Sequence, residues 1–318
     1  DGTSEIQRLQ MATQTGKNVQ VYAVNGNFDD AQTGVKRVFA DASVAEELEK
    51  RGIRLSSANS INWGRLVPQI VYYFYAYFRL VEQGAAAWGS PVDFCVPTGN
   101  FGDILAGYYA KQMGLPVGRL VCASNKNNVL TDFLRTGTYD ARRTFYKTTS
   151  PSMDILISSN LERLLYHVSG SSEKVAAWMQ RLAETGVYTV DAETLAKIQE
   201  SFAAGCADDA AGFTEIKARF AEDNYLCDTH TAVAFRVAKD LGTETPMAVL
   251  STASPFKFPR DVLAALGEDA PASDFAAMAA LTAATDAPAP ESLRVLDTLP
   301  VRFTAAIDPA NIRAAALR

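Results

Sequence analysis

Residues 92–114 read VDFCVPTGNFGDILAGYYAKQMG, and this stretch decides the fold. The apolar run 92–96 is typical of a buried strand, PTGNFGD of a glycine-containing turn, and ILAGYYAKQMG of a helix. Two further runs, RLVCAS at 119–124 and MAVLST at 247–252, are typical of strands. The order strand, loop, helix, strand predicts an α/β protein with a parallel sheet and right-handed crossovers.

Composition narrows the classes of function. The chain has 318 residues and a net charge of -6, and no long basic run interrupts this balance. Because a nucleic-acid-binding protein needs a basic face, we expect no nucleic-acid partner. The longest apolar stretch, 66–80, contains Pro68, Gln69 and Arg79 and is too short to span a bilayer, so no membrane role is expected.

Cysteine and histidine usage indicates a reducing compartment and no metal. The four cysteines form no CxxC pair, which favours free thiols and a cytoplasmic location. With only His167 and His230 available, a zinc site is not expected. No secretory signal peptide opens the printed sequence.

The pattern along the chain suggests two domains. We predict a division at residue 88, with 1–88 as the remainder of a smaller domain and 89–318 as a large domain. The region of about 150–240 is predicted to be almost wholly helical, and the Ala- and Pro-rich stretch 270–290 to be poorly ordered or inserted. The opening DGTSEIQRLQM reads like the middle of a protein, so we expect a truncated chain.

The strongest local feature is the loop Thr98–Asp103 between the strand and the helix. Its glycines allow a tight turn that points successive N–H groups at one spot, and the following helix N-terminus adds partial positive charge. Both properties suit a phosphate. The alternative is a close-packed turn that binds nothing, and the local pattern alone does not separate the two readings.

A second polar stretch, Ser57–Arg65, stands at a predicted helix start after a strand. Asn59, Ser60 and Arg65 can converge on one anion. Taken alone, an ordinary helix cap with a surface arginine explains the same residues better. The stretch gains weight from its presence in one chain with the glycine loop.

Hydroxyl residues follow the third predicted strand. Ser251 and Thr252 come where parallel sheets bind ligands, at the carboxyl end of a strand, and Pro255 then forces a turn. A strand end whose hydroxyls bond the backbone is the simpler alternative. Near 228–231, Asp228 fits a helix N-cap, and His230 reads as a structural histidine, so we place neither in the site.

Taken together, these motifs resemble threonine synthase of the longer bacterial and fungal type. The stretches that carry the resemblance are SEIQRLQM, GNFDDAQ, SSANSINWGR, the QIVYYFY run, VPTGNFGDILAGYYAKQMG, SPSMDI, SNLERLL, DTHTAV and LSTASPFKFP. NSINWGR and PTGNFGDILAGYYAK are specific enough to exclude most other cofactor-dependent lyases. The tail beyond Gly267 matches poorly.

The resemblance implies a parallel-sheet pyridoxal-phosphate fold of the tryptophan synthase β type, truncated at the N-terminus and carrying a helical insertion. Its implied enzyme class is a carbon-oxygen lyase that acts on phosphates. It converts O-phospho-L-homoserine and water to L-threonine and phosphate, the last step of threonine biosynthesis, with pyridoxal 5'-phosphate as cofactor. The smaller domain would be on the substrate side, and the large domain would bind the cofactor. A monomer or homodimer is expected.

The resemblance also assigns roles to residues of this chain. The cofactor phosphate maps onto Gly99, Asn100, Phe101, Gly102 and Asp103. The hydroxyl that faces the pyridine nitrogen corresponds to Thr252. The residues that bind the substrate phosphate correspond to Asn59, Ser60, Arg65 and Asn100. An arginine suits such a dianion because its donors form a planar fork.

Two departures from the family pattern matter. Asp103 would place a carboxylate beside a phosphate, and we expect its side chain to turn back onto backbone N–H groups. The lysine that holds the cofactor covalently belongs to a Phe-Lys-Asp string, which does not occur here; Phe256-Lys257-Phe258 belongs to a different motif. No catalytic residue is therefore assigned, and this chain alone is expected to be inactive.

Two other hypotheses stay open at this point. One is a non-catalytic, threonine-synthase-like phosphate-binding domain that uses the fold without the lysine. The other is a nucleotide- or sugar-phosphate enzyme on a similar sheet. The latter ranks last because an acidic ribose-binding residue is missing at the usual distance after the glycine loop.

Overall fold

A computed structural model describes residues 4–26, 28–242 and 244–318, which divide into two compact units. One unit is Asp1–Ser57 together with Ala270–Arg318, and the other is Ala58–Asp269. These bounds differ from the predicted division at residue 88, because the aromatic helix before that residue packs on the core after it. Which domain serves substrate and which cofactor stays a prediction.

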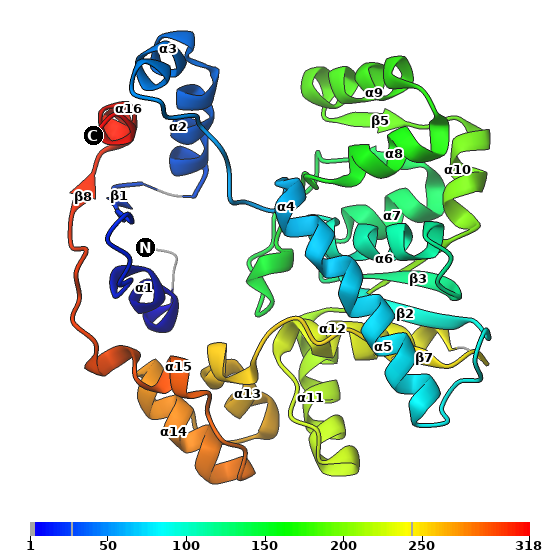
Figure 1. Cartoon of the computed structure of the whole chain (residues 1–318). Helices are drawn as coiled ribbons and strands as arrows, with labels where there is room; N and C mark the ends of the chain where they lie inside the picture. The colour runs from blue at the N-terminus through cyan, green and yellow to red at the C-terminus, as the bar shows by residue number, and fades with distance from the viewer. Residues whose placement is uncertain (1–3, 27, 243) are drawn as a thin grey trace. The chain divides into compact units, whose positions relative to one another are not determined.

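A four-stranded parallel sheet organises the unit Ala58–Asp269, in the order β6-β3-β2-β7 (Figure 1). The strands are β2 (Val92–Pro97), β3 (Val117–Ser124), β6 (Phe202–Cys206) and β7 (Met247–Val249). Three of them, β2, β3 and β7, overlap the runs that the sequence predicted, and the parallel α/β class is confirmed. Because all four strands are parallel, their carboxyl ends meet at one edge.

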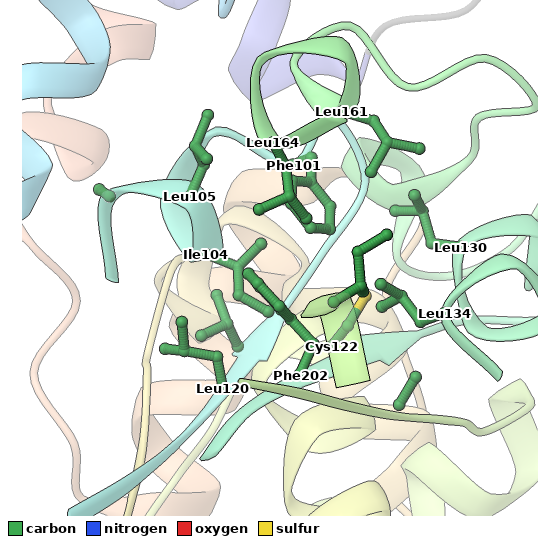
Figure 2. Packing of buried hydrophobic residues seen from close by; sticks show 14 of the residues in the cluster. Phe101, Ile104, Leu105, Leu120, Cys122, Leu130, Leu134, Leu161, Leu164 and Phe202 are labelled. Atoms are coloured by element: carbon green, nitrogen blue, oxygen red, sulfur yellow. The ribbon is translucent and has the colours of Figure 1, made fainter. Parts of the chain in front are cut away.

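Alternate residues of the central strands enter two different cores. Phe94 and Val96 face a cluster that includes helix α6 (Gly102–Gln112), whereas Cys95 faces helix α12 (Thr229–Leu241). Side chains of a strand point alternately to its two faces, so this continuous apolar run serves a sheet that is covered on both sides. Figure 2 shows the first of these clusters, in which Leu120 and Phe202 lie with residues of α6.

The aromatic run forms helix α5 (Ile70–Glu82), which follows α4 (Trp63–Leu66) and the short 3-10 turn Val67–Gln69 that contains Pro68. Tyr73 and Tyr77 are buried in the core of the unit. The opposite side of the helix remains open, with Tyr75 66% exposed. Pro68 thus lies in the 3-10 turn between α4 and α5, and α5 packs on this unit through one face only.

The region of about 150–240 contains strands as well as helices, so the prediction of an almost wholly helical region was wrong in part. The missed strand β6 is an edge strand of the main sheet, and β5 (Val187–Thr189) pairs antiparallel with β4 (Thr138–Asp140). Ala203 and Gly205 in β6 are small residues that carry little strand signal of their own. Pairing with β3 defines the strand.

The helices of this unit not yet given are α7 (Val129–Thr136), α8 (Leu161–Ser169), α9 (Ser172–Thr185), α10 (Ala192–Gln199), α11 (Asp209–Asp223) and α13 (Pro259–Leu266). Short 3-10 turns span Pro151–Met153 and Pro255–Lys257. Within the part of the chain that the structure describes, no helix is both long and apolar enough to cross a membrane.

The other unit joins the two ends of the sequence. Its elements are α1 (Glu5–Ala12), β1 (Ala23–Val24), α2 (Phe28–Ala40), α3 (Ala42–Lys50), α14 (Asp274–Thr285), α15 (Glu291–Arg294), β8 (Ala306–Ile307) and α16 (Ile312–Ala316), with 3-10 turns at Leu296–Thr298 and Pro309–Asn311. β1 pairs in parallel with β8. Within 270–290, Asp274–Thr285 forms helix α14 with Ala277 and Leu281 buried, so poor order was wrong for this part, and the alternative of an insertion stays a prediction.

Gly107 generates a test of how closely α5 approaches the sheet layer. A Cβ at this helical glycine would lie 2.5 Å from Cε1 of Tyr73 and 2.8 Å from a methyl carbon of Leu120. We expect Gly107→Ala to lower the free energy of unfolding by about 1–3 kcal/mol, because the added methyl group would overpack this interior.

The matched control is Gly212→Ala in α11, where the nearest described neighbour of a Cβ is the Cβ of Ala232 at 4.0 Å. Helix propensity should make this variant equal to wild type or more stable by up to about 1 kcal/mol. Urea denaturation measures both variants. Equal stability of Gly107→Ala and Gly212→Ala would contradict the packing described for α5.

Candidate functional site

A cleft of about 940 Å³ opens at the carboxyl edge of the sheet, beyond the ends of β2 and β7. Its lining brings together residues that are far apart in sequence, among them the glycine loop (98–103), the strand end at 248–253 and the α4–α5 segment. The distances in sequence are large, and the parallel pairing of β2 with β7 is what joins the first two. This is where open α/β sheets bind ligands.

The glycine loop (98–103) makes its turn at Phe101, which has left-handed backbone with φ 60° and a buried ring. Phe101 is the N-cap of α6, so the helix begins at Gly102 with no side-chain cap. The first N–H groups of α6 have no partners within the helix. These groups and the positive end of the helix dipole point toward the same place. The loop therefore offers donors and partial positive charge to an anion.

Gly99 is required because backbone lies directly against it. A Cβ at this position would be 2.8 Å from the carbonyl oxygen of Ser152 and 3.1 Å from Cα of Met153. The 3-10 turn Pro151–Met153 therefore packs on the loop, and Ser152 and Met153 also line the cleft. Sequence reasoning did not place them in the site.

Asp103 stands in the first turn of α6, and its partner is Tyr73. The Tyr73 hydroxyl donates to the main-chain oxygen of Asp103 at 2.8 Å and lies 3.2 Å from its carboxylate oxygen Oδ1. Burial raises the pKa of Asp103 to about 6, although the hydrogen bond from Tyr73 lowers it. The expected backbone N–H partners are replaced by this phenol.

Thr252 lines the cleft directly after β7, together with Ser251. Pro255 begins a short 3-10 turn in which Ser254 Oγ accepts a hydrogen bond from the N–H of Phe256 at 3.3 Å. This turn brings Lys257 to the cleft wall. The resemblance gave Lys257 no role, and its charge now stands beside the other candidate anion-binding groups.

In the second polar stretch, Ser60 and Arg65 line the cleft and Asn59 is outside its described lining. Asn59 Oδ1 accepts from the N–H of Ile61 at 3.0 Å, which shapes the turn. Arg65 donates from Nη1 to the carbonyl of Ala58 at 2.9 Å and remains exposed, so four of its five donor hydrogens are left for other partners. Asn100 also faces the cleft.

His230 is a cleft residue that sequence reasoning left out. It is 3% exposed, its Nδ1 lies 3.0 Å from Asp228 Oδ1, and its Nε2 accepts from the N–H of Ser152 at 3.2 Å. Asp228 is the N-cap of α12, as predicted, and accepts from the N–H groups of His230 and Thr231. The motif DTHT signalled the cap, but nothing local showed that its histidine reaches the turn above the glycine loop.

Metal binding has no support in the described ranges, where no three His, Cys, Asp or Glu side chains cluster in a way that could hold an ion. Burial raises the pKa of the Cys122 thiol to about 12, so this cysteine is a core residue rather than a nucleophile.

The raised pKa of Asp103 predicts a pH-dependent stability. Because the folded chain binds this proton more tightly than the unfolded chain, ionised Asp103 destabilises the fold above about pH 6, and the cost disappears as the pH falls toward 4. We expect Asp103→Asn to be more stable than wild type by about 3 kcal/mol at pH 8, and this difference to fall to about 1 kcal/mol at pH 4.5.

Thermal unfolding at both pH values measures this difference. Asp240→Asn, which removes an exposed helical carboxylate paired with Arg236, serves as control and should show almost no pH-dependent difference. A gap between Asp103→Asn and wild type that does not change with pH would refute the assignment of a buried, proton-binding carboxyl.

Comparison with known proteins adds a family. Residues 231–315 match the family model described as Threonine synthase, C-terminal, which includes the tail that the sequence alone did not relate to the family. Threonine synthase-like 1 of Homo sapiens is 42% identical over 270 residues, covering 84% of this chain and 36% of its own length. Threonine synthase of Pseudomonas aeruginosa is 41% identical over 265 residues, covering 81% of this chain and 54% of its own length.

Solved structures agree with these relatives. A PLP-bound threonine synthase from Brucella melitensis superposes with a TM-score of 0.83 at 37% identity, and yeast threonine synthase with 0.81 at 34%. Each match covers 98% of this chain and 62% of the solved one. Family model, relatives and solved structures thus agree that this chain is a partial-length match to the threonine synthases.

Proposed function

We propose that this chain is part of a threonine synthase, which converts O-phospho-L-homoserine and water to L-threonine and phosphate with pyridoxal 5'-phosphate. One observation carries the proposal: a single cleft holds the glycine loop (98–103), Thr252 and the Ser60–Arg65 side. The cofactor and the substrate each carry a phosphate. The cleft has two anion-binding walls, one for each of these phosphates.

The described residues fit such a cofactor. The N-terminus of α6 suits its phosphate, and the lack of a side chain at Gly99 lets the 3-10 turn Pro151–Met153 pack on the loop. Thr252 offers a hydroxyl to the pyridine nitrogen. Because a hydroxyl can both donate and accept, it does not enforce protonation of the ring as a carboxylate would.

The remaining residues would position the substrate. Arg65 has a planar fork of donors that suits a phosphate dianion, and Ser60 and Asn100 add neutral donors. The cofactor, when bound, supplies an electron sink for carbanion chemistry. We assign no residue of this chain to proton transfer, because the Phe-Lys-Asp string of the family does not occur in the printed sequence.

The alternative is a non-catalytic phosphate-binding domain on the same fold. It is favoured by the absence of that lysine string together with the name Threonine synthase-like 1 of the human relative. Reading the open reading frame around this sequence separates the two: an in-frame Phe-Lys-Asp favours the synthase. In either case we propose a small-molecule ligand.

Location and assembly complete the proposal. Four free cysteines, three of them buried, suit a reducing compartment such as the cytoplasm. A monomer or homodimer is proposed, with the substrate bound on the Ser60–Arg65 side. In the predicted division, residues 1–88 would then serve the substrate and residues 89–318 the cofactor.

The binding sites are tested with pyridoxine 5'-phosphate, an analogue that has an alcohol in place of the aldehyde and cannot form stray Schiff bases with surface lysines. Calorimetric titration should show saturable binding to this chain. Thr252→Val should weaken it by about fivefold through loss of one hydrogen bond. Arg65→Ala should leave it unchanged.

O-phospho-L-homoserine should show the opposite pattern. Arg65→Ala is expected to weaken its binding by about 30-fold, the effect of one lost charge-assisted contact, and Thr252→Val to have little effect. If Arg65→Ala binds the substrate like wild type, Arg65 is only a surface residue.

Turnover is the third test. This chain, supplied with pyridoxal 5'-phosphate and O-phospho-L-homoserine, is expected to release no phosphate above the rate in buffer. Lys257 lines the cleft, so Lys257→Met is the control that traces any activity to it. If the chain shows turnover and Lys257→Met abolishes it, then Lys257 is a catalytic lysine and the conclusion that this chain has none is wrong.

A further inference from the structure

One short segment touches both anion-binding walls of the cleft. The residues Ser158–Arg163 follow the 3-10 turn Pro151–Met153 and include the first residues of helix α8. They bond the glycine loop (98–103) on one side and the Ser60 turn (59–63) on the other. The two walls are about 40 residues apart in sequence. A third segment that contacts both walls can therefore fix the distance between them.

Asn160 contacts both walls with a single side-chain amide. Its Nδ2 donates to the carbonyl of Asn100 at 2.9 Å and to the carbonyl of Ser60 at 3.1 Å. Both hydrogens of the amide are used, and the presence of two acceptors sets the orientation of the group. The side chain is 0% exposed, so these bonds are shielded from water.

Neighbouring residues bond one wall each. Ser158 Oγ donates to the carbonyl of Gly99 at 3.0 Å, which concerns the glycine loop alone. Arg163 donates from Nη2 to the carbonyl of Ile61 at 2.7 Å and has its guanidinium 5.7 Å from the centre of the Trp63 ring, which concerns the Ser60 turn alone. Ser159 Oγ also lies 3.1 Å from Ser60 Oγ, so the segment holds one double contact and three single ones.

The core beneath holds this segment in place. Asn160 is the N-cap position of α8, and Leu161 and Leu164 of that helix belong to the same buried cluster as Phe101 of the glycine loop. Figure 2 shows these leucines and Phe101 side by side in the core. The amide therefore projects from a packed helix start, which restricts its position.

We propose that Asn160 is a positioning residue that sets the spacing between the glycine loop (98–103) and the Ser60 turn (59–63), and thereby between the two bound phosphate groups. It does not line the described cleft and touches neither ligand in this assignment. It acts through the carbonyls that it holds. The proposal rests on the proposed function only in its second half, since the spacing of the two walls is a property of the chain itself.

Hydrogen–deuterium exchange on this chain tests the first half without any ligand. Asn160→Ala should speed exchange about tenfold in both 97–104 and 58–66, since each wall loses one bond. Ser158→Ala should act on 97–104 alone, and Arg163→Met on 58–66 alone. Gln180→Ala, which deletes an exposed amide on α9, should change neither window.

Ligand binding tests the second half. We expect Asn160→Ala to weaken both pyridoxine 5'-phosphate and O-phospho-L-homoserine about tenfold. Ser158→Ala should weaken the first and Arg163→Met the second. Because a merely structural role would lower the Tm without this ligand-selective pattern, the pattern is the decisive readout.

The outcomes separate the two ideas. If wild type binds neither ligand but Asn160→Ala loosens both walls, the proposed function falls and the spacing role of Asn160 stands. If Asn160→Ala lowers only the Tm, with exchange unchanged in both windows or increased throughout the unit, the positioning role is wrong. Should Asn160→Ala fail to fold, Asn160→Ser, which keeps one donor, replaces it and should show the same two-wall pattern more weakly.

Discussion

The left-handed turn at Phe101 is the constraint on which the site depends. Its φ of 60° reverses the chain between β2 and α6, and its buried ring anchors that reversal in the core. A non-glycine residue in this conformation is uncommon and needs support from its surroundings. The support comes from both directions, since Phe202 of β6 packs against the ring from the sheet and α8 packs from above. Backbone N–H groups at the start of α6 are presented to the cleft as a result.

The sequence predicted those parts of the fold that local pattern can encode. The run at 92–96 is apolar apart from Asp93, because both faces of β2 are covered, and the glycine loop follows at once. β6 was missed because its identity depends on its neighbours. Gly205 weakens any strand signal, yet a Cβ there would lie 2.7 Å from a methyl of Val237, so the glycine lets α12 approach the sheet. Tertiary packing, not propensity, selects this residue.

The same distinction applies to the site. The family resemblance assigned Thr252 to the pyridine nitrogen and Ser60, Arg65 and Asn100 to the substrate phosphate, and all four residues line the cleft. His230 and Asn160 carry no such local signal. Each acts on backbone of a distant segment, at Ser152 and at Ser60 with Asn100, and only folded geometry shows those partners. These distant partners cannot be predicted from a single sequence, because an amide or imidazole at the start of a helix is most simply interpreted as part of a helix cap.

The proposed binding of two dianions has to be consistent with a chain of net charge -6. Arg65 and Lys257 are the cationic side chains in its described lining, and Asp103 opposes them. Two cations do not neutralise two phosphates, so neutral donors and the dipole of α6 must contribute much of the attraction. These contributions are directional and act over short distances, unlike the field of an ammonium group. Hydrogen-bond donors of this kind bind well only if the backbone that carries them is rigid. Buried contacts such as those of Asn160 and His230 make the backbone of the cleft wall rigid.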